Sequence, residues 1–574
     1  MNYAPIYNIA EICHQLGVSD AVLSPGSRNA PLLISFNRHP KIKTYVINDE
    51  RSAAFIALGM AQKSKLPVVL IATSGSAAYN YAPAVAEAFF QQIPLIILTA
   101  DRPQEWIDQK DGQTIYQQNI YGNHVKKSFQ CPVDIDNKEA AWHFERTFSD
   151  AINLADDGAK GPVHINIPFR EPFYPNKDAK PSYKTAKTIH KSFITKQLSN
   201  ADWANLVDEW NLYSKRLIVV GQHHLSTELL LILGELKAKK HIPVIGGILS
   251  NMHATPELIK SHDIFIDALP EAQLTELQPE LLITFGASVL SKSLKKYLRT
   301  HKPKAHWHIQ QDGMVSDTFQ SLTRIIPVTP INFFNSIKDI VKKSHFDYSQ
   351  NWLSYQNKSR KFVEDFHTTE VFNEFTTLHT ILTNLPMSCD VHFANSMTVR
   401  YANIIGLSHS YRQIELFCNR GTSGIDGSTS TALGAALKAK KTTLLITGDM
   451  AFFYDRNAFW HHHIPPNLRV IVLNNHGGGI FDLIDGPNKL PEKEEFFITK
   501  QDLKAKNLAE EFGITYYHCA SIGGLSNGLN KFWVQDGHPK ILEIESFIDV
   551  NTQVFKNFKK QAKKLWNQPT LGKA

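Results

Sequence analysis

The chain has 574 residues, of which 43% are hydrophobic and 20% are charged, a composition typical of a folded globular protein with about three or four domains. Its 61 basic and 54 acidic residues give a net charge of +7 that is spread along the chain, so a nucleic-acid surface is not indicated. No apolar stretch approaches the roughly 18 residues of a membrane span, and the start of the chain lacks a signal-peptide pattern. We therefore expect a cytoplasmic protein, with its five scattered cysteines reduced.

The first block, residues 1–180, alternates short β-type runs with helical periodicity. The predicted strands are residues 43–47, 67–73, 94–99 and 163–167. A helix is predicted at residues 52–63. Glu50 follows the first of these strands, and Asp49 is placed to cap the helix. Glycine-containing turns at residues 24–32 and 73–80 also follow predicted strands. Because ligands collect at the carboxyl edge of a parallel sheet, we expect these segments to line a site.

Proline and lysine cluster at residues 172–191, which predicts a linker before a second block at residues 192–345. Its strand candidates are residues 217–220, 243–245 and 281–285. No Gly-x-Gly-x-x-Gly follows them, so a dinucleotide site is not indicated. A polar segment at residues 342–361 then leads to a third block at residues 365–574. Together the blocks predict an α/β protein of three doubly wound domains with mainly parallel sheets.

Two apolar runs of the third block end in residues that suit a metal ion. One ends at Asp449, and the other, residues 470–473, is followed by Asn475 and Gly477. A crossover helix at residues 451–463 would make the two strands parallel and bring both polar ends to one sheet edge. The carboxylate, the amide oxygen and the Gly477 carbonyl are hard oxygen ligands, which favour Mg²⁺ with phosphate oxygens completing its coordination.

This spacing resembles the thiamine diphosphate motif, although Met450 stands where many members have glycine. Longer segments resemble one family of that class, the 2-succinyl-5-enolpyruvyl-6-hydroxy-3-cyclohexene-1-carboxylate synthases of menaquinone biosynthesis. The likeness covers essentially the full length. Its most specific segments are S-P-G-S-R-N-A-P-L at 24–32, T-A-D-R-P at 99–103, N-R-G-T-S-G-I-D-G at 419–427 and N-N-H-G-G-G-I-F at 474–481.

The resemblance implies thiamine diphosphate and Mg²⁺ or Mn²⁺ as cofactors. It also implies decarboxylation of 2-oxoglutarate and addition of the resulting succinyl carbanion to isochorismate. Glu50 matches the glutamate that keeps the cofactor's N1′ protonated, and Ile425 matches the apolar residue that wedges the cofactor into a V shape. Three carboxylates of the two substrates remain after CO₂ is lost, and arginines are their expected partners. The implied catalytic residues are Glu50, Arg28, Gln113, Arg400 and Arg420.

The remaining implied contacts follow the same motifs. Substrate contacts are implied for Ser27, Arg28, Arg102, Lys292, Asn395, Arg400, Arg420, Ile480, Phe481 and Ile484. Cofactor contacts are implied for Glu50, Gly75, Asn80, Ser396, Ile425, Gly448, Asp449, Met450, Ala451, Asn475 and Ile480, and metal contacts for Asp449, Asn475 and Gly477. Some members follow the residue equivalent to Lys292 with arginine, whereas this chain has Ser293, so Lys295 or Lys296 would have to replace that cation.

Several alternatives stay open at this stage. The resemblance implies that the first domain of one chain faces the third domain of another, in a homodimer or a dimer of dimers. A carboligase of the acetolactate synthase type, or a noncatalytic sensor that binds thiamine diphosphate, would share the cofactor motif. Three consecutive histidines at residues 461–463 could suggest a transition-metal site, but consecutive residues of a helix point in different directions.

Overall fold

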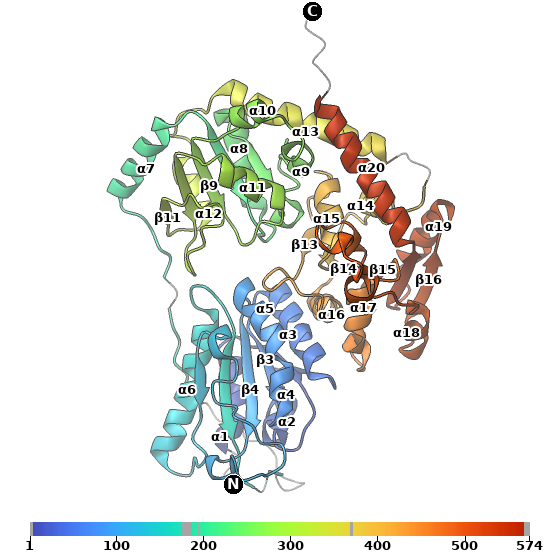
Figure 1. The fold of residues 1–574 in the computed structure, drawn as a ribbon. Coiled ribbons are helices and arrows are strands. Elements are labelled where there is room, and N and C mark those ends of the chain that lie inside the picture. The colour runs from blue at the N-terminus through green and yellow to red at the C-terminus, as the bar shows by residue number, and fades with distance from the viewer. Residues whose placement is uncertain are drawn as a thin grey trace, which may run out of the picture.

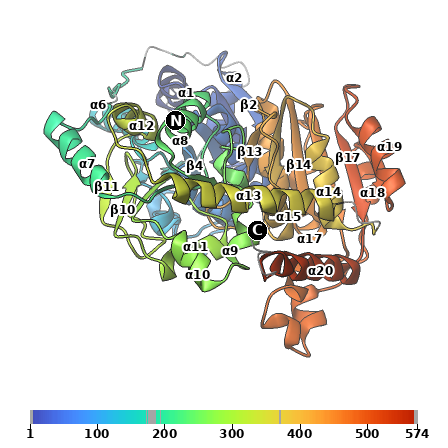
Figure 2. The same ribbon diagram turned by 90° about the horizontal axis from the view of Figure 1, so that it is seen from above.

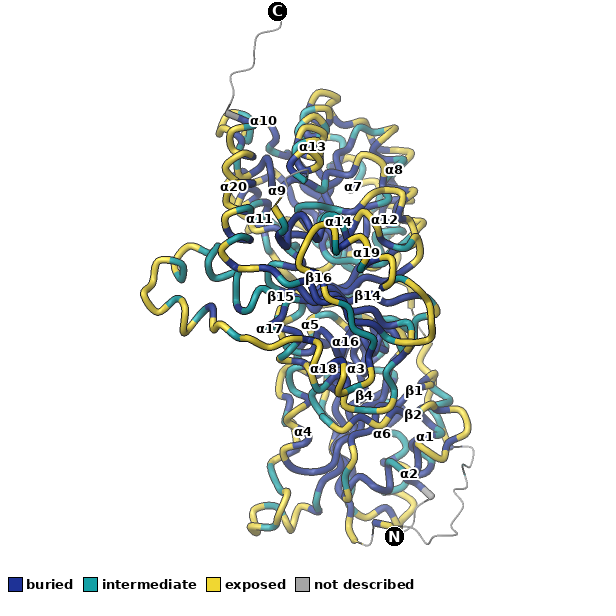
Figure 3. Tube along the Cα trace, turned by 90° about the vertical axis from the view of Figure 1, so that its right-hand side faces the viewer, coloured by how far each residue is buried: buried dark blue, intermediate teal, exposed yellow. Residues whose placement is uncertain are grey.

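The computed structural model describes residues 4–171, 173–174, 183, 186–192, 194–367 and 371–567 (Figure 1). Within them the chain forms three parallel sheets, each with its own helices, which confirms the predicted α/β class. Figure 3 shows buried strands at the centre and exposed helix faces outside. The domain boundaries stay a prediction, and much of the expected linker, including residues 175–182, lies outside the described residues.

The first sheet has the strand order β2-β1-β3-β4-β6-β5. Its central strands are buried on both faces, which explains why they read as continuous apolar runs. The strands are Asp20–Leu23 (β1), Lys43–Val46 (β2), Val68–Ala72 (β3), Leu95–Asp101 (β4), Ser128–Gln130 (β5) and Val163–Pro168 (β6). The helices are Ala4–Gln15 (α1), Ala30–Arg38 (α2), Glu50–Ser64 (α3), Ser76–Asn80 (α4), Ala82–Gln91 (α5) and Lys138–Asp156 (α6).

The second sheet has the order β11-β10-β9-β7-β8. Its strands are Arg216–Val220 (β7), Val244–Gly246 (β8), Leu281–Phe285 (β9), Ala305–Ile309 (β10) and Arg324–Ile326 (β11). Its helices include Asn200–Leu212 (α7), Thr227–Lys240 (α8), His262–Ile266 (α9), Glu271–Glu276 (α10), Lys292–Thr300 (α11) and Pro330–Ile337 (α12). Most of the polar segment at residues 342–361 belongs to a further helix, α13 (Phe346–Phe366), which buries Tyr348 and Trp352 and runs toward the third sheet (Figure 2).

The third sheet has the order β13-β12-β14-β15-β17-β16. Its strands are Cys389–Phe393 (β12), Glu415–Phe417 (β13), Thr442–Gly448 (β14), Leu468–Asn474 (β15), Thr515–Cys519 (β16) and Lys540–Glu545 (β17). Its helices are Glu374–Thr383 (α14), Met397–Ile405 (α15), Ser428–Lys438 (α16), Asp449–Tyr454 (α17), Ala505–Glu511 (α18), Ile522–Phe532 (α19) and Ile548–Asn567 (α20). Between β15 and α18 the chain stands out from the body as short helical turns (Figure 2).

The single crossover helix predicted at residues 451–463 is wrong. The chain forms the short helix α17 and then a 3₁₀ turn at Arg456–Phe459. Asp455 lies between them, where its carboxylate accepts hydrogen bonds from the backbone N–H (2.7 Å) and hydroxyl (2.8 Å) of Ser430. These bonds satisfy the start of α16 and hold the chain in a turn, so α17 does not continue.

Helices α3 and α16 join the first and third sheets along their lengths (Figure 1). A Cβ on Gly59 would lie 1.9 Å from the Thr431 carbonyl oxygen, and one on Gly434 would lie 2.0 Å from the Ile56 carbonyl oxygen. The two backbones therefore touch directly, at positions where only glycine fits.

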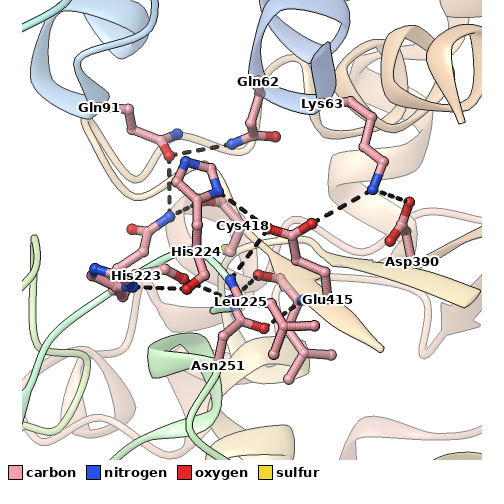
Figure 4. Close-up of polar contacts among 12 residues, drawn as sticks. Gln62, Lys63, Gln91, His223, His224, Leu225, Asn251, Asp390, Glu415 and Cys418 are labelled. Carbon is pink, nitrogen blue, oxygen red and sulfur yellow. Dashed lines mark hydrogen bonds and ion pairs between the residues drawn. The ribbon is translucent and has the colours of Figure 1, made fainter. Parts of the chain in front are cut away.

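A polar junction connects all three sheets (Figure 4). Glu415, at the start of β13, accepts a hydrogen bond from His224 beyond β7 (3.2 Å) and one from Lys63 of α3 (3.5 Å). Lys63 also pairs with the buried Asp390 at 2.7 Å. Burial alone would raise the pKa of Glu415, but the hydrogen bond and charge of His224 and the charge of Lys63 lower it to about 2. Glu415 is thus ionised at neutral pH.

Two further expectations concern compartment and membranes. All five cysteines are free and buried. Among the helices of the described residues, none combines the length and apolar character needed to cross a bilayer.

Candidate active site

The parallel register of β14 and β15 brings the two predicted metal-binding ends together. Gly448 pairs with Leu473, so Asp449 and Asn475 leave the sheet side by side. Burial raises the pKa of Asp449 to about 6, although hydrogen bonds from the Gln501 side chain (2.7 Å) and from the backbone N–H groups of Met450 and Gly477 favour its charged form. A carboxylate buried in this way suits a cation.

Asn475 supplies the clearest sign of a missing partner. Its amide nitrogen donates to Glu374 at 2.7 Å, whereas its amide oxygen is buried without a hydrogen-bond partner among the described residues. A buried, unsatisfied oxygen costs free energy unless a ligand binds it. The Gly477 carbonyl accepts one bond, from the Gly479 N–H at 3.0 Å, and keeps a second lone pair. These residues fit the expected divalent ion.

The turns of the first domain also meet at a sheet edge. Glu50 is the first residue of α3, and Asp49 caps this helix as predicted, accepting from the Ser52 N–H at 2.9 Å. Burial and, to a smaller extent, the charge of Glu50 raise the pKa of the Tyr81 hydroxyl, so Glu50 lies within electrostatic reach of Tyr81. Gly75 has a φ of +86°, and an added Cβ would come within 3.3 Å of the Gln113 backbone. Gln113 therefore lies against the Gly75 turn.

Arg28 and Arg102 form one cluster of positive charge at this edge. Arg28 is buried and donates to the Phe169 carbonyl at 2.9 Å, and burial together with the charge of Arg102 lowers its pKa. Arg102 pairs with Asp111 at 3.0 Å and donates to the Gly112 carbonyl. The outer residues Ser27 and Asn80 are exposed.

Arg400 and Arg420 form a second cluster, in the third domain. Burial and the charge of Arg420 lower the pKa of Arg400, which donates to the Ser396 carbonyl at 2.5 Å. Arg420 donates to Asn395 at 2.7 Å, and its Nε is buried without a hydrogen-bond partner among the described residues. Two neighbouring guanidinium groups with an unused donor suit an anionic ligand.

Asn395 and the loop after Arg420 are held together. The Asn395 amide donates to the Asn419 and Gly424 carbonyls, each at 2.7 Å. Ile425, next along this loop, is 37% exposed, which is unusual for a large apolar side chain fixed in this way. The other apolar candidates, Ile480, Phe481 and Ile484, lie half-buried at or just beyond the 3₁₀ turn Gly479–Asp482. Ala451 is buried in α17.

The structure separates the two lysines that could replace the missing arginine. Ser293 donates to Asp267 at 2.7 Å, away from any anion site. Lys295 is half-buried, and burial together with the charges of Arg299, Arg420 and Lys292 lowers its pKa. Lys292 and Lys296 are exposed. Lys295 therefore lies within electrostatic reach of the second arginine cluster.

Arg420 also lines a cavity of about 720 Å³ between the three domains. Part of its wall is the junction of Figure 4, where Gln222 donates to Gln91 at 3.0 Å and to the Cys418 carbonyl at 3.1 Å. A space of this size is in the range that holds small molecules.

Three polar residues of this region were not predicted from the sequence. Glu374 contacts Asn475, and Gln501 contacts Asp449. Glu87, buried in α5, accepts from the Gly421 N–H (2.7 Å) and Thr422 N–H (2.6 Å), in the loop that carries Arg420. A single carboxylate in the apolar run of α5 is a signal that could have identified Glu87, whereas Gln501 carries none.

Two of the three consecutive histidines accept hydrogen bonds from backbone N–H groups. The Nε2 atom of His463 accepts from the Val46 N–H at 3.2 Å, and the Nδ1 atom of His461 accepts from the His463 N–H at 3.0 Å. The part of the chain that the structure describes has no group of three or more His, Cys, Asp and Glu side chains placed to hold a metal ion.

Comparison with known proteins agrees with this geometry. Residues 7–124 match the thiamine pyrophosphate enzyme N-terminal TPP binding domain, and residues 183–391 match the middle domain of thiamine pyrophosphate enzymes. A 2-succinyl-5-enolpyruvyl-6-hydroxy-3-cyclohexene-1-carboxylate synthase of Cytophaga hutchinsonii is 48% identical, over 97% of this chain and 98% of the relative. Synthases of the same name from Flavobacterium psychrophilum and Bacteroides thetaiotaomicron are 40% and 35% identical, over 96% and 97% of this chain and 97% and 98% of the relatives. The chain therefore belongs to the 2-succinyl-5-enolpyruvyl-6-hydroxy-3-cyclohexene-1-carboxylate synthase family of thiamine diphosphate enzymes.

Proposed function

We propose that the protein removes CO₂ from 2-oxoglutarate and adds the remaining succinyl unit to isochorismate, a step of menaquinone biosynthesis. The observation that carries this proposal is the half-buried pair Arg400 and Arg420, with an unused Nε donor on Arg420. These substrates carry four carboxylates, three of which remain after CO₂ is lost, and they need such cations, whereas pyruvate, the substrate of an acetolactate synthase-type enzyme, brings only one. The arginine clusters thus favour the family's own substrates over that rival.

Asp449, Asn475 and the Gly477 carbonyl would hold Mg²⁺, or Mn²⁺ in its place, and the ion would bind the diphosphate. Bound thiamine diphosphate supplies the nucleophilic carbon and the electron sink that decarboxylation of a 2-oxo acid requires. Glu50 would keep a proton on the pyrimidine N1′, and Gly75 would let the backbone approach the ring closely. Ile425 would press on the cofactor from the exposed face of its loop.

Arg28 and Arg102 would bind one group of substrate carboxylates, and Arg400 with Arg420 another. We assign the additional cation to Lys295, because burial and its interaction with Arg420 set it apart from the exposed Lys296. Lys292 would contribute from the rim of the same helix.

A homodimer, or a dimer of such dimers, is the assembly we propose. The charged partners of Arg28 are Arg102, Glu171, Asp111 and Asp101, all in the first domain, whereas Arg400 interacts with Arg420 and Cys418 in the third. Facing first and third domains of two chains would unite these half-sites. The free, buried cysteines are consistent with the cytoplasm as the compartment.

The test is an assay of purified protein with thiamine diphosphate, Mg²⁺, isochorismate and either 2-oxoglutarate or pyruvate. We expect CO₂ release from 2-oxoglutarate and none from pyruvate. In Glu50→Gln we expect the rate of CO₂ release to fall about a hundredfold or more, with the cofactor still bound. Turnover of pyruvate would support the acetolactate synthase-type rival. Cofactor-induced thermal stabilisation without CO₂ release from either acid would support a noncatalytic sensor.

A further inference from the structure

We propose that Glu374 is a positioning residue for the divalent metal ion, because it fixes the orientation of the Asn475 side chain. This role rests on the proposed function, since the ion belongs to the proposed cofactor site. Glu374 lies in α14, remote in sequence from both strands that carry the metal-binding residues.

The first step is the chemistry of the contact. The Asn475 side chain has one donor end and one acceptor end. Its nitrogen donates to the Glu374 carboxyl oxygen at 2.7 Å, so its oxygen faces the opposite way. That oxygen is the atom that is buried without a hydrogen-bond partner in the described part of the chain. Glu374 thereby selects the one orientation of the amide that offers a ligand atom to a cation.

The second step is the rigidity of Glu374 itself. The residue is 3% exposed and opens α14, whose cap Asn373 accepts from the Thr376 N–H at 3.1 Å. The Glu374 N–H donates to the Asn551 side chain at 2.9 Å, and Asn551 in turn donates to Ser546 at 3.0 Å. A carboxyl group held on such a support can define the position of its partner.

The third step is energetic. A buried carboxyl group is costly, and this one lies close enough to Asp449 for their charges to interact. Folding places it there although a hydrophobic residue would pack more cheaply. A divalent ion between Asp449 and Asn475 would favour the ionised form of both carboxyl groups, which gives the arrangement a reason.

The experiment measures metal binding directly. Full-length protein with thiamine diphosphate is titrated with Mn²⁺, and the free ion is followed by its electron paramagnetic resonance signal. In Glu374→Leu the amide loses its acceptor and can turn its NH₂ group toward the ion, so we expect the Kd to rise about 10- to 100-fold. Glu374→Gln keeps a weaker, neutral acceptor, and we expect a rise of about 3- to 10-fold.

A matched control uses another buried glutamate beside the same loop. Glu543 accepts from the neighbouring Asn474 side chain at 2.7 Å, and Asn474 is not among the proposed ligands. Glu543→Gln is expected to change the Kd less than about twofold, because Asn474 reaches a proposed ligand only indirectly, through Gln501 and Asp449. An equal loss in Glu374→Gln and Glu543→Gln would overturn the proposal in favour of general loop stability.

A second background separates orientation from simple electrostatic attraction. In Asn475→Asp both side-chain oxygens can bind the ion, so there is no amide to orient. There we expect Glu374→Leu to change the Kd less than about threefold, because no amide remains for Glu374 to orient. A tenfold weakening in this background as well would overturn the positioning role.

These outcomes are distinct from failure of the proposed function. Wild-type protein that does not bind Mn²⁺ in the presence of thiamine diphosphate would remove the cofactor site itself. Wild-type binding with an unchanged Kd in both Glu374 variants would remove only the role of Glu374. Glu374→Gln, the smaller change, keeps the test decisive where Glu374→Leu does not fold.

Discussion

Two like-charged arginine clusters are the most unusual feature at the scale of single residues. Burial and the charge of Arg420 lower the pKa of Arg400, yet an arginine stays protonated in a protein. Their repulsion is therefore a standing cost, which an anionic substrate would relieve. Lys295 adds to this charge from the central domain.

The role of Lys295 can be tested against its neighbour. Lys295→Ala removes a half-buried cation near Arg420, so we expect KM for at least one substrate to rise about tenfold, the loss of a charge-assisted contact. Lys296→Ala removes an exposed lysine one position along the same helix, and we expect its kinetics to match the wild type. Steady-state kinetics with each substrate varied in turn would decide. Equal effects of the two substitutions would refute the assignment.

Residue roles were only partly accessible from the sequence. The proximity of Asp449 and Asn475 was predictable, because a polar residue after each of two apolar runs must reach the same sheet edge. Glu374 was not, since Asn373-Glu374 reads as an ordinary helix start, and its partner Asn475 is 101 positions away. The choice between Lys295 and Lys296 likewise needed the burial that only the folded helix provides.

At the scale of elements, α3 and α16 hold the first and third domains in contact through glycine. Gly59→Ala would place a methyl group 1.9 Å from the Thr431 carbonyl oxygen, so the helices must separate. We expect a loss of about 3 kcal/mol or more in the free energy of unfolding, at the upper end of overpacking costs. Urea unfolding of the purified variant measures this.

Gly234→Ala in the middle of α8 is the matched control for that substitution. Its nearest neighbour would be Pro256 at 3.6 Å, an ordinary contact. Because alanine favours a helix, we expect a gain of about 0.5–1 kcal/mol. A small effect of Gly59→Ala, similar to the control, would mean that the two helices are not in tight contact.

Asp455, which ends α17, makes stability depend on pH. Burial raises its pKa to about 7 despite the hydrogen bonds from Ser430. The pKa of Asp455 in the folded state exceeds its value in the unfolded state. Its contribution to the free energy of unfolding is therefore full at low pH and is lost as the pH rises from about 4 to 7. In that window the free energy of unfolding should fall with pH less steeply in Asp455→Asn than in the wild type, by up to about 1.4 kcal/mol per pH unit. The free energy of unfolding is measured by urea denaturation at a series of pH values. Curves of the same slope for wild type and variant would contradict this prediction.

Strands were easier to predict than connections, for a physical reason. Buried parallel strands are apolar on both faces, so β9 and β3 could be recognised from their own residues. The path after β14 depends instead on the bonds between Asp455 and Ser430, residues from separate elements. Local periodicity carries no information about such a contact, and the predicted long helix was wrong.

At the scale of the whole molecule, polar contacts unite the domains of one chain. Glu415 links the three sheets through His224 and Lys63 (Figure 4), while α3 and α16 pack directly. The half-sites nevertheless interact with separate partners: the charge of Glu50 acts on Tyr81 in the first domain, and Asp449 contacts Gln501 and Gly477 in the third. A second chain that unites them is therefore a testable consequence.

Mixing two inactive variants tests this arrangement. Glu50→Gln and Asp449→Ala are unfolded, combined in equal amounts and refolded together. If each site takes Glu50 from one chain and Asp449 from the other, a mixed dimer has one intact site and one with both defects. Random association would then restore about a quarter of the wild-type activity.

A second mixture provides the control, with Glu50→Gln and Arg28→Ala, whose residues both belong to the first domain. In that mixed dimer every site keeps one defect, so we expect no recovery. The measurement is CO₂ release from 2-oxoglutarate after refolding, normalised to refolded wild type. Recovery in neither mixture, with mixed dimers demonstrated by a tag on one variant, would place Glu50 and Asp449 in the same chain's site. Recovery in the first mixture alone would establish a site shared between chains. Only a site built from the first domain of one chain and the third domain of the other can combine an intact Glu50 with an intact Asp449.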